Sequence, residues 1–352
     1  AVEGGLLHRM YHVVTNQKSY AIKLLNPDIM RRPDALKNMV NSEHIAQCLT
    51  EYGTACTAGP ITMSESDADR PPSAIPVVAA IKFQGQHLLC LEHGGNDLPT
   101  EASSDMAEQY AFVYPWIEAR SIFAPEIGIT HCRRIGHILG LMHQADSRPK
   151  EMPYELEKEE AKRSLYDWQG YLTLAEKQQA PWLSRYEMML PGLCRWDQAA
   201  VDAMESVHSH QVISHRDLDP KNVLWQGEQP YLIDWEAAGY VNPYQELLEV
   251  LNYWGCDETG SYDPALCRAL LQAYTQFMDL REVDWAPIFA CSCDSMLGWL
   301  EYTLKKSLGL EEDKSAQGPQ QMLAAYRDMQ RYEAQAERLR EMVTESHGTP
   351  RH

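Results

Sequence analysis

Three polar residues between positions 212 and 236 have the types and spacing needed to move a phosphoryl group. Asp217 follows a short apolar run and begins the stretch Asp-Leu-Asp-Pro-Lys-Asn, which ends at Asn222. Asp234 follows a later apolar run, Leu232-Ile233. Phosphoryl transfer depends more on positioning and charge neutralisation than on covalent help from the protein. The pattern therefore predicts one carboxylate that orients a hydroxyl and two oxygen ligands for a hard metal ion.

We expect Asp217 to be the catalytic carboxylate, which accepts a hydrogen bond from the attacking hydroxyl and receives its proton late. Asn222 and Asp234 are predicted to bind Mg²⁺, because this ion prefers oxygen ligands in octahedral geometry. His-Arg-Asp with an Asn five residues after the Asp is a kinase catalytic-loop signature. The alternative is a β-hairpin with solvated polar turns. We expect His215 and Arg216 to brace the loop against the strand that ends at Asp234, and Asp219 to face solvent.

The elements that must hold these residues change in character along the chain. Residues 10–15 and 19–25 are short β-rich runs around a turn, and a helical pattern follows from about 33 to 53. Further strands are predicted at 88–91 and 110–114. The intervening stretches 54–74 and 93–107 have the composition of surface loops, and their purpose is open.

Helices dominate the later part of the sequence. Helical patterns occur near 135–143, 244–254, 264–280, 287–308 and 319–344. Asp197 is a candidate N-cap for a further helix. We therefore expect an N-terminal nucleotide-binding lobe over residues 1–113, a hinge at about 114–118, and a helical C-terminal lobe over 119–352 with the catalytic loop and the acceptor site.

The stretch 212–239 resembles the catalytic region of the aminoglycoside phosphotransferase and choline kinase-like family, which shares the protein-kinase fold. Asp234-Trp235-Glu236 stands where protein kinases have Asp-Phe-Gly, and no Ala-Pro-Glu segment follows. Without that segment there is no platform for a peptide substrate. The resemblance implies an α+β, two-lobed fold: a small N-terminal lobe with an antiparallel sheet and one helix, and a large, mainly helical C-terminal lobe.

The same resemblance implies residues that bind the nucleotide. Lys23, in Ala21-Ile22-Lys23, matches the lysine that binds the α- and β-phosphates, and the stretch 4–11 matches the loop that covers them. Glu43 is the expected ion-pair partner of Lys23, with Glu51 as the competitor. Tyr114, Trp116 and Ile117 match the hinge whose backbone groups contact the adenine or guanine edge.

Composition limits the partners of the protein. The net charge of −19 argues against nucleic acid and anionic membranes, which need a positive surface, and no apolar run is long enough to cross a bilayer. The nine cysteines are scattered without metal-site spacing, and we interpret them as reduced thiols of a cytoplasmic protein. The oligomeric state is open.

These observations together predict an Mg²⁺-dependent small-molecule kinase. It would transfer the γ-phosphate of ATP, or of GTP, to a hydroxyl of an aminoglycoside or a related amino-sugar or amino-alcohol. Choline, ethanolamine and homoserine kinases of the same fold are the alternatives, and a nucleotide-binding pseudokinase or scaffold without turnover is an alternative of another class. Side chains for a cationic acceptor could come from an acidic, aromatic set, although packing roles are the simpler explanation for each: Trp168, Tyr171, Trp182, Trp196, Glu246, Glu249, Trp254, Asp257, Glu258, Glu301 and Tyr302.

Overall fold

The computed structural model describes residues 8–55, 75–91, 109–145, 154–156, 158, 163–311 and 318–345, with the side chains of 51–55 left aside. The chain divides into two compact units, which are described separately. Unit 1 comprises Ala1–Glu126, Gln144–Glu157 and Ile213–Gly239, and unit 2 comprises Ile127–His143, Lys158–Val212 and Tyr240–His352. Residues 213–239, which include Asp217, Asn222 and Asp234, thus group with the N-terminal strands. The lobe boundary expected at 114–118 stays a prediction, and the loops 54–74 and 93–107 lie almost wholly outside the described residues.

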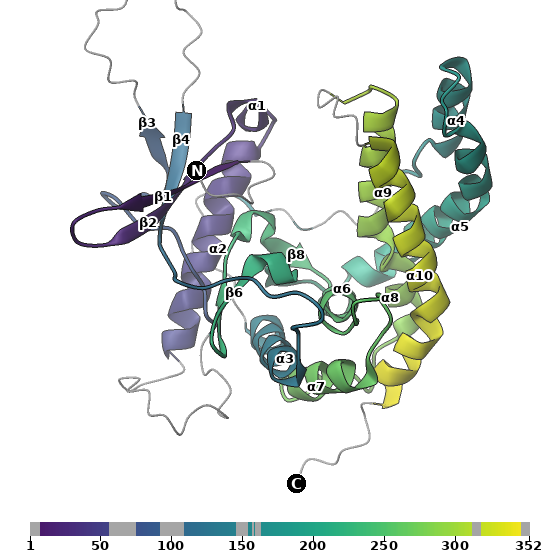
Figure 1. The fold of residues 1–352 in the computed structure, drawn as a ribbon. Helices are drawn as coiled ribbons and strands as arrows, with labels where there is room; N and C mark the ends of the chain where they lie inside the picture. The colour runs from purple at the N-terminus through teal and green to yellow at the C-terminus, as the bar shows by residue number, and fades with distance from the viewer. Residues whose placement is uncertain are drawn as a thin grey trace, which may run out of the picture. The chain divides into compact units, whose positions relative to one another are not determined.

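An antiparallel sheet forms the N-terminal part of unit 1 (Figure 1). Its order is β1 (Arg9–Val14), β2 (Ser19–Leu24), β4 (Gln109–Pro115) and β3 (Leu89–Leu91). In the turn between β1 and β2, the Thr15 hydroxyl accepts the Lys18 N–H at 3.0 Å. Strand β2 pairs on both edges, and Lys23 lies opposite Met10 on one side and Phe112 on the other. Double pairing fixes the register of the predicted phosphate-binding lysine.

Helix α2 (Ala35–Ala55) lies beside this sheet and buries one face. Its Ile45, Ala46 and Leu49 have no exposed surface. A smaller core cluster joins Leu25, Met39, Ala80 and Phe112. The short helix α1 (Pro27–Met30) precedes α2 and starts with a cap in which Asn26 accepts the Asp28 N–H at 3.0 Å. The strands and the helix expected near the N-terminus are confirmed.

Residues 212–241, which carry the predicted catalytic and metal-binding side chains, form very short elements. They are β5 (Val212–Ser214), the 3₁₀ helix η2 (Pro220–Asn222), β6 (Val223–Gln226), β7 (Gln229–Leu232), the 3₁₀ helix η3 (Trp235–Ala237) and β8 (Gly239–Val241). Strands β6 and β7 form an antiparallel hairpin, and Gly227 takes the left-handed conformation in its turn with φ +60°. On the outer edge of β7, Leu232 exchanges backbone hydrogen bonds with Pro76 and Val78 at 2.8 and 2.9 Å.

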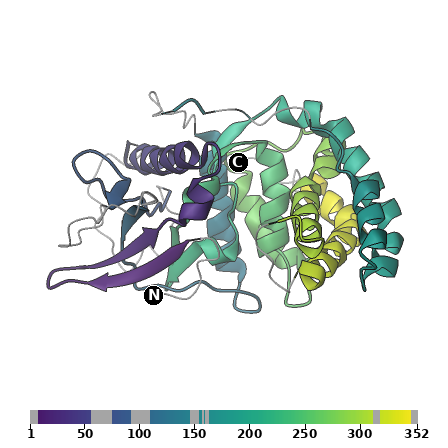
Figure 2. The ribbon, with the colours of Figure 1, turned by 90° about the horizontal axis from the view of Figure 1, so that it is seen from above.

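Unit 2 consists mainly of helices, as the sequence predicts. They are α3 (Ile129–Gln144), α4 (Trp168–Lys177), α5 (Leu183–His208), α6 (Pro243–Trp254), α7 (Pro264–Tyr274), α8 (Trp285–Cys291), α9 (Asp294–Ser307) and α10 (Gly318–Glu345). Side chains of Asp167, Asn242, Asp263 and Asp284 accept backbone N–H groups at four of the N-termini. Helices α9 and α10 run side by side (Figures 1 and 2).

The expectation that Asp197 caps a helix is wrong. Helix α5 begins at Leu183 and passes Asp197 without a break, so this residue lies in the helix interior. Its carboxylate is fully buried and accepts hydrogen bonds from the Arg163 guanidinium at 2.7 Å and from the Trp168 indole at 2.8 Å. A buried charge needs such partners, and they explain an aspartate at a core position.

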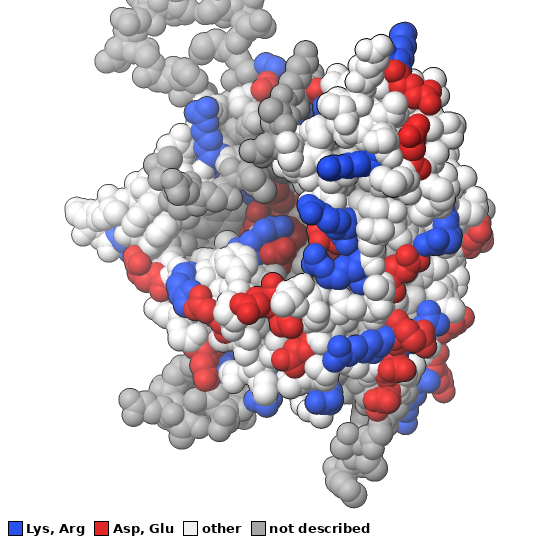
Figure 3. Space-filling view, turned by 45° about the vertical axis from the view of Figure 1, so that its right-hand side comes forward, with Lys and Arg blue, Asp and Glu red and all other residues white. Residues whose placement is uncertain are grey.

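Charged side chains of both signs are interspersed over the face of the molecule shown in Figure 3. In the described residues, we find no helix that combines the length and the apolar character needed to span a membrane. Eight of the nine cysteines lie in the described residues, and each of these is a thiol.

Candidate active site

The loop that carries Asp217 starts with an unusual backbone conformation. Arg216 adopts a left-handed φ of +64°, which turns the chain sharply before Asp217. Its guanidinium packs against Gly239, where a Cβ would lie 3.2 Å from Arg216 Nη1. Because non-glycine residues rarely adopt this conformation, such strain is typical of functional loops. The next residue after Asp217, Leu218, is buried and anchors the loop.

Asn222 holds the Asp217 carboxylate directly. Its side-chain amide donates to the backbone oxygen and to Oδ2 of Asp217, both at 2.9 Å. Asn222 is itself buried at the end of η2. Two bonds from one amide fix both the loop and the rotamer of Asp217. The amide oxygen of Asn222 is then directed away from Asp217, and it is the atom that a metal ion would take.

His215 braces the loop as expected. The fully buried ring lies with Nε2 3.0 Å from the backbone oxygen of Ile233, the residue before Asp234. Nδ1 accepts the backbone N–H of Asp217 at 3.3 Å. These two bonds define a neutral ring protonated at Nε2, and they connect the Asp217 loop to the Asp234 strand.

Asp219 does not simply face solvent. Its carboxylate accepts the Lys221 N–H at 2.8 Å and so caps η2. Oδ2 of the same carboxylate lies 3.8 Å from the Lys221 ammonium. The residue therefore shapes the turn between Asp217 and Asn222.

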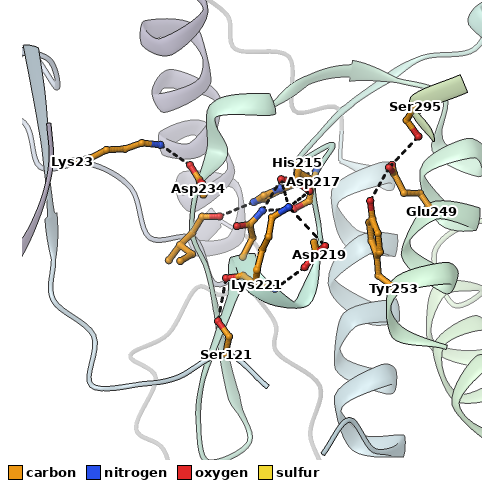
Figure 4. Close-up of polar contacts among 12 residues, drawn as sticks. Lys23, Ser121, His215, Asp217, Asp219, Lys221, Asp234, Glu249, Tyr253 and Ser295 are labelled. Carbon is orange, nitrogen blue, oxygen red and sulfur yellow. Dashed lines mark hydrogen bonds and ion pairs between the residues drawn. The ribbon is translucent and has the colours of Figure 1, made fainter. Parts of the chain in front are cut away.

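Asp234 and Lys23 are brought together. Asp234 adopts a left-handed φ of +60°, and its Oδ1 accepts from the Lys23 ammonium at 2.6 Å (Figure 4). Lys23 also donates to Glu236 Oε2 at 2.7 Å. Burial lowers the pKa of Lys23, but the two carboxylates outweigh it and the net shift is upward. The ammonium thus stays charged at neutral pH.

Glu236 is a third acidic residue of this cluster, which the sequence argument did not single out. Its Oε2 lies 3.5 Å from Nε2 of His8, a buried residue whose Nδ1 accepts the Asn26 N–H at 3.0 Å. Burial works to raise the pKa of Glu236, yet the His8 hydrogen bond and the Lys23 charge lower it to about 2. Its position two residues after Asp234 is the sequence feature that could have indicated a place in this cluster.

Glu43 does not form the ion pair expected with Lys23. Its Oε2 accepts the Ala80 N–H at 3.0 Å, and its Oε1 accepts the Tyr114 hydroxyl in a very short hydrogen bond. Burial raises the pKa of Glu43, and the Tyr114 bond, the Ala80 bond and the more distant Lys23 charge oppose the rise. Lys23 pairs instead with the carboxylates of the Asp234 segment. Glu51, the alternative partner, lies on the end of α2 whose side chains are outside the described residues.

The predicted hinge residues are partly engaged within the chain. The Trp116 N–H donates to Ser19 at 3.2 Å, and the Ile117 carbonyl accepts from Ala119 at 2.9 Å. The Trp116 indole stacks on His12 with ring centroids 3.7 Å apart. The Tyr114 side chain points into the protein, toward Glu43. Contact of this segment with a base stays a prediction.

The donor set fits a magnesium ion. Asn222 and Asp234 supply an amide oxygen and a carboxylate, and 39% of the Asp234 side chain is exposed. Mg²⁺ is usually held by one or two protein oxygens and completes its shell with water and substrate phosphates. Such an ion would neutralise phosphate charge.

The acidic and aromatic side chains that the sequence offered for an acceptor have separate roles in unit 2. Glu246 is buried against His143 at 2.7 Å, and Trp254 is fully buried. Glu301 pairs with Tyr171 and Lys305. Glu249 is half-buried, and the Tyr253 hydroxyl donates to it at 3.2 Å (Figure 4). Four others pack in the core or lie at the surface, namely Trp168, Trp182, Trp196 and Asp257.

Comparison with known proteins identifies the family. Residues 1–280 match the model of the phosphotransferase enzyme family, so the chain belongs to this family. The resemblance drawn from the catalytic segment is thereby confirmed.

Sequence relatives include a homoserine kinase of Pseudomonas aeruginosa, which is 32% identical over 174 residues. The match covers 46% of this chain and 49% of that protein. A homoserine kinase of Sinorhizobium medicae is 29% identical over 189 residues, which cover 51% of this chain and 52% of that protein. The chain therefore spans about half the length of the curated relatives that it matches.

Solved structures share the fold at low identity. A spectinomycin phosphotransferase in complex with ADP and spectinomycin has a TM-score of 0.63 and 15% identity, and the match covers 92% of this chain and 87% of that chain. A choline kinase from Cryptosporidium parvum has a TM-score of 0.55 and 11% identity, and the match covers 95% and 89%. The expected protein-kinase-like fold is confirmed.

Proposed function

We propose that this protein is a small-molecule kinase that transfers the γ-phosphate of ATP or GTP to a hydroxyl group in the presence of Mg²⁺. The observation that carries the proposal is the arrangement within unit 1 of two polar pairs: Asp217 held by Asn222, and Asp234 held by Lys23. One pair supplies a carboxylate for the acceptor hydroxyl. The other supplies a cation for phosphates and a carboxylate for the metal ion.

Asp217 would orient the attacking hydroxyl and accept its proton as the new bond forms. Its two bonds from Asn222 restrict it to one rotamer, which is the positioning that phosphoryl transfer needs. All four residues are present, and this set disfavours a pseudokinase. A metal-dependent nucleotide-binding signal without phosphate transfer to any acceptor would instead support the pseudokinase alternative.

The acceptor belongs to one of two groups. From the residues alone we preferred an aminoglycoside or a related amino-sugar or amino-alcohol. The sequence relatives favour a small hydroxy amino acid, because the curated proteins at 29 to 32% identity are homoserine kinases.

A coupled phosphorylation assay tests the proposal. The panel contains aminoglycosides, amino-sugars, homoserine, choline and ethanolamine, each with ATP and with GTP in parallel. We expect transfer to at least one amine-bearing hydroxyl compound, and none without a divalent ion. Transfer to none of them, with nucleotide binding intact, would contradict the proposal. We also propose a cytoplasmic location, which fits the eight thiols and the supply of nucleotide.

A further inference from the structure

Lys221 lies inside the catalytic loop with its backbone held on both sides. Its N–H donates to the Asp219 carboxylate at 2.8 Å, and its carbonyl accepts the Ser121 hydroxyl at 3.1 Å (Figure 4). It is the middle residue of η2, between Pro220 and Asn222. A short helical turn fixed at both ends gives the side chain a defined starting direction.

That direction is toward Asp217. The Lys221 ammonium lies 3.3 Å from Oδ2 and 3.4 Å from Oδ1 of Asp217. It also lies 3.8 Å from Asp219 Oδ2. The carboxylates of Asp217 and Asp219 therefore act on one ammonium group.

The two lysines of the site differ in how closely they are held. Lys23 makes two short bonds at 2.6 and 2.7 Å, and only 10% of its side chain is exposed. The contacts of Lys221 are longer, and 51% of its side chain is exposed. An ammonium has three donors, and loose ion pairs leave Lys221 able to bind an anionic ligand at the same time.

We propose that Lys221 is a second catalytic cation that contacts the transferring phosphoryl group. This inference rests on the proposed kinase function. A hydroxyl bound by Asp217 would lie about 2.6–3.2 Å from its carboxylate. The phosphorus that it attacks would lie about 3–3.5 Å further on. An ammonium that touches both oxygens of Asp217 is within reach of the phosphoryl oxygens at that point.

The chemistry balances without a proton from Lys221. A bond forms between the acceptor oxygen and the γ-phosphorus, and the bond from that phosphorus to the β,γ-bridging oxygen breaks. The hydroxyl proton passes to Asp217, and the nucleoside diphosphate leaves with the electron pair. Lys221 donates hydrogen bonds to the non-bridging oxygens, whose charge it stabilises through the transition state.

The competing explanation is that Lys221 only positions Asp217. The two roles differ in a double-mutant cycle, because a residue that acts only through Asp217 has no further effect once Asp217 is changed. They also differ in the binding of a phosphoryl mimic, which a lysine in contact with the phosphoryl group would stabilise directly.

The test compares the wild type with K221Q, K221R, D217N and D217N/K221Q in the full chain. We expect K221Q to lower kcat about 100-fold, with the dissociation constant for ADP within about threefold of the wild type. K221R should recover part of the loss, because it retains the charge with a different shape. K221Q should lower the residual rate of D217N at least about tenfold further. The matched control is K18Q, which removes an exposed lysine from the turn between β1 and β2.

A second readout needs no turnover. Binding of ADP with aluminium fluoride and the acceptor, measured by calorimetry, should weaken about 100-fold in K221Q, while ADP alone binds as before. The role of Lys221 would be overturned if K221Q had the kcat of the wild type. It would also be overturned if K221Q had no effect in the D217N background and left binding of ADP with aluminium fluoride unchanged. Either result would leave the proposed kinase function standing. A wild type that phosphorylates no acceptor would overturn the proposed function, and this inference with it.

Discussion

Lys23 and Asp234 form a partly buried ion pair in which the ammonium lies 2.6 Å from the carboxylate (Figure 4). We assign the two residues to different parts of the nucleotide complex. Lys23 would bind the phosphates, and Asp234 would bind a metal ion. In the structure they neutralise one another. Binding of a metal–nucleotide complex would therefore replace this ion pair by two contacts, one between Lys23 and the phosphates and one between Asp234 and the metal ion. Affinity for the nucleotide should then depend on the metal.

Asp234→Ala tests this exchange. In the wild type, we expect Mg²⁺ to increase affinity for ADP, because the ion joins the carboxylate to the phosphates. In the variant this increase should fall by about 30-fold or more, equivalent to about 2 kcal/mol. Metal-free binding should change little, since Lys23 keeps Glu236. Calorimetric titration of ADP with and without Mg²⁺ measures both.

Asp28→Ala is the matched control, because Asp28 is an exposed carboxylate of unit 1 whose side chain is 71% accessible. It should leave the effect of Mg²⁺ unchanged. If Asp234→Ala binds ADP with the same dependence on Mg²⁺ as the wild type, Asp234 is not a metal ligand.

Asp217→Asn separates chemistry from binding. The substituted amide keeps an oxygen that can accept from Asn222, so the loop should retain its shape. It loses the negative charge that accepts the hydroxyl proton, and kcat should fall by about a thousandfold or more. The dissociation constant for the nucleotide should stay within about threefold. A variant that keeps most of its activity would remove Asp217 from the chemistry.

Short-range pattern was enough to predict the tight loop that carries Asp217 and Asn222. The spacing from Asp217 to Asn222 belongs to one tight loop, so residue type and local geometry determine the contact between them. The same holds for β1 and β2, the strand that carries Lys23. The alternation of their residues and the turn between them are local features.

Contacts across long separations were not predictable in the same way. Glu43 lies on the expected helix and is buried, as a partner of Lys23 would be. Its carboxylate instead accepts hydrogen bonds from the Tyr114 hydroxyl and the Ala80 N–H. The choice among several nearby acids depends on side-chain packing, which a single sequence does not encode in its spacing. Asp197 was misassigned for a related reason: an aspartate inside a helix resembles a cap until its buried partner Arg163 is known.

Tyr114→Phe should destabilise the protein in a pH-dependent way. Burial raises the pKa of Glu43, and the Tyr114 hydrogen bond holds it down. Removal of the hydroxyl raises this pKa further. We expect a loss of about 1–3 kcal/mol in the free energy of unfolding at pH 8, because the hydroxyl stabilises the charged form of the carboxyl group. The loss should be smaller at pH 5, where a larger share of Glu43 is protonated in the folded state.

Urea denaturation at pH 8 and at pH 5 measures the difference. Tyr20→Phe is the control, since Tyr20 lies on β2 and its hydroxyl has no hydrogen-bond partner in the described part of the chain. It should cost less than about 0.5 kcal/mol at both pH values. If Tyr114→Phe lost the same free energy of unfolding at the two pH values, the Tyr114 hydroxyl would have no effect on the pKa of Glu43.

Asp197→Ala should destabilise unit 2 by about 2–4 kcal/mol, because it leaves the Trp168 indole and the Tyr166 N–H without their acceptor. Arg163 also loses one of its two carboxylate partners and keeps Asp294. The residue is fully buried, so water cannot replace the lost carboxylate. Asp202→Ala, an exposed change on the same helix, should cost less than about 0.5 kcal/mol. Chemical denaturation followed by tryptophan fluorescence compares the two. Because Trp168 donates to Asp197, its emission should shift in the native baseline of Asp197→Ala only, and equal stability of the two variants would mean that the ion pair contributes nothing.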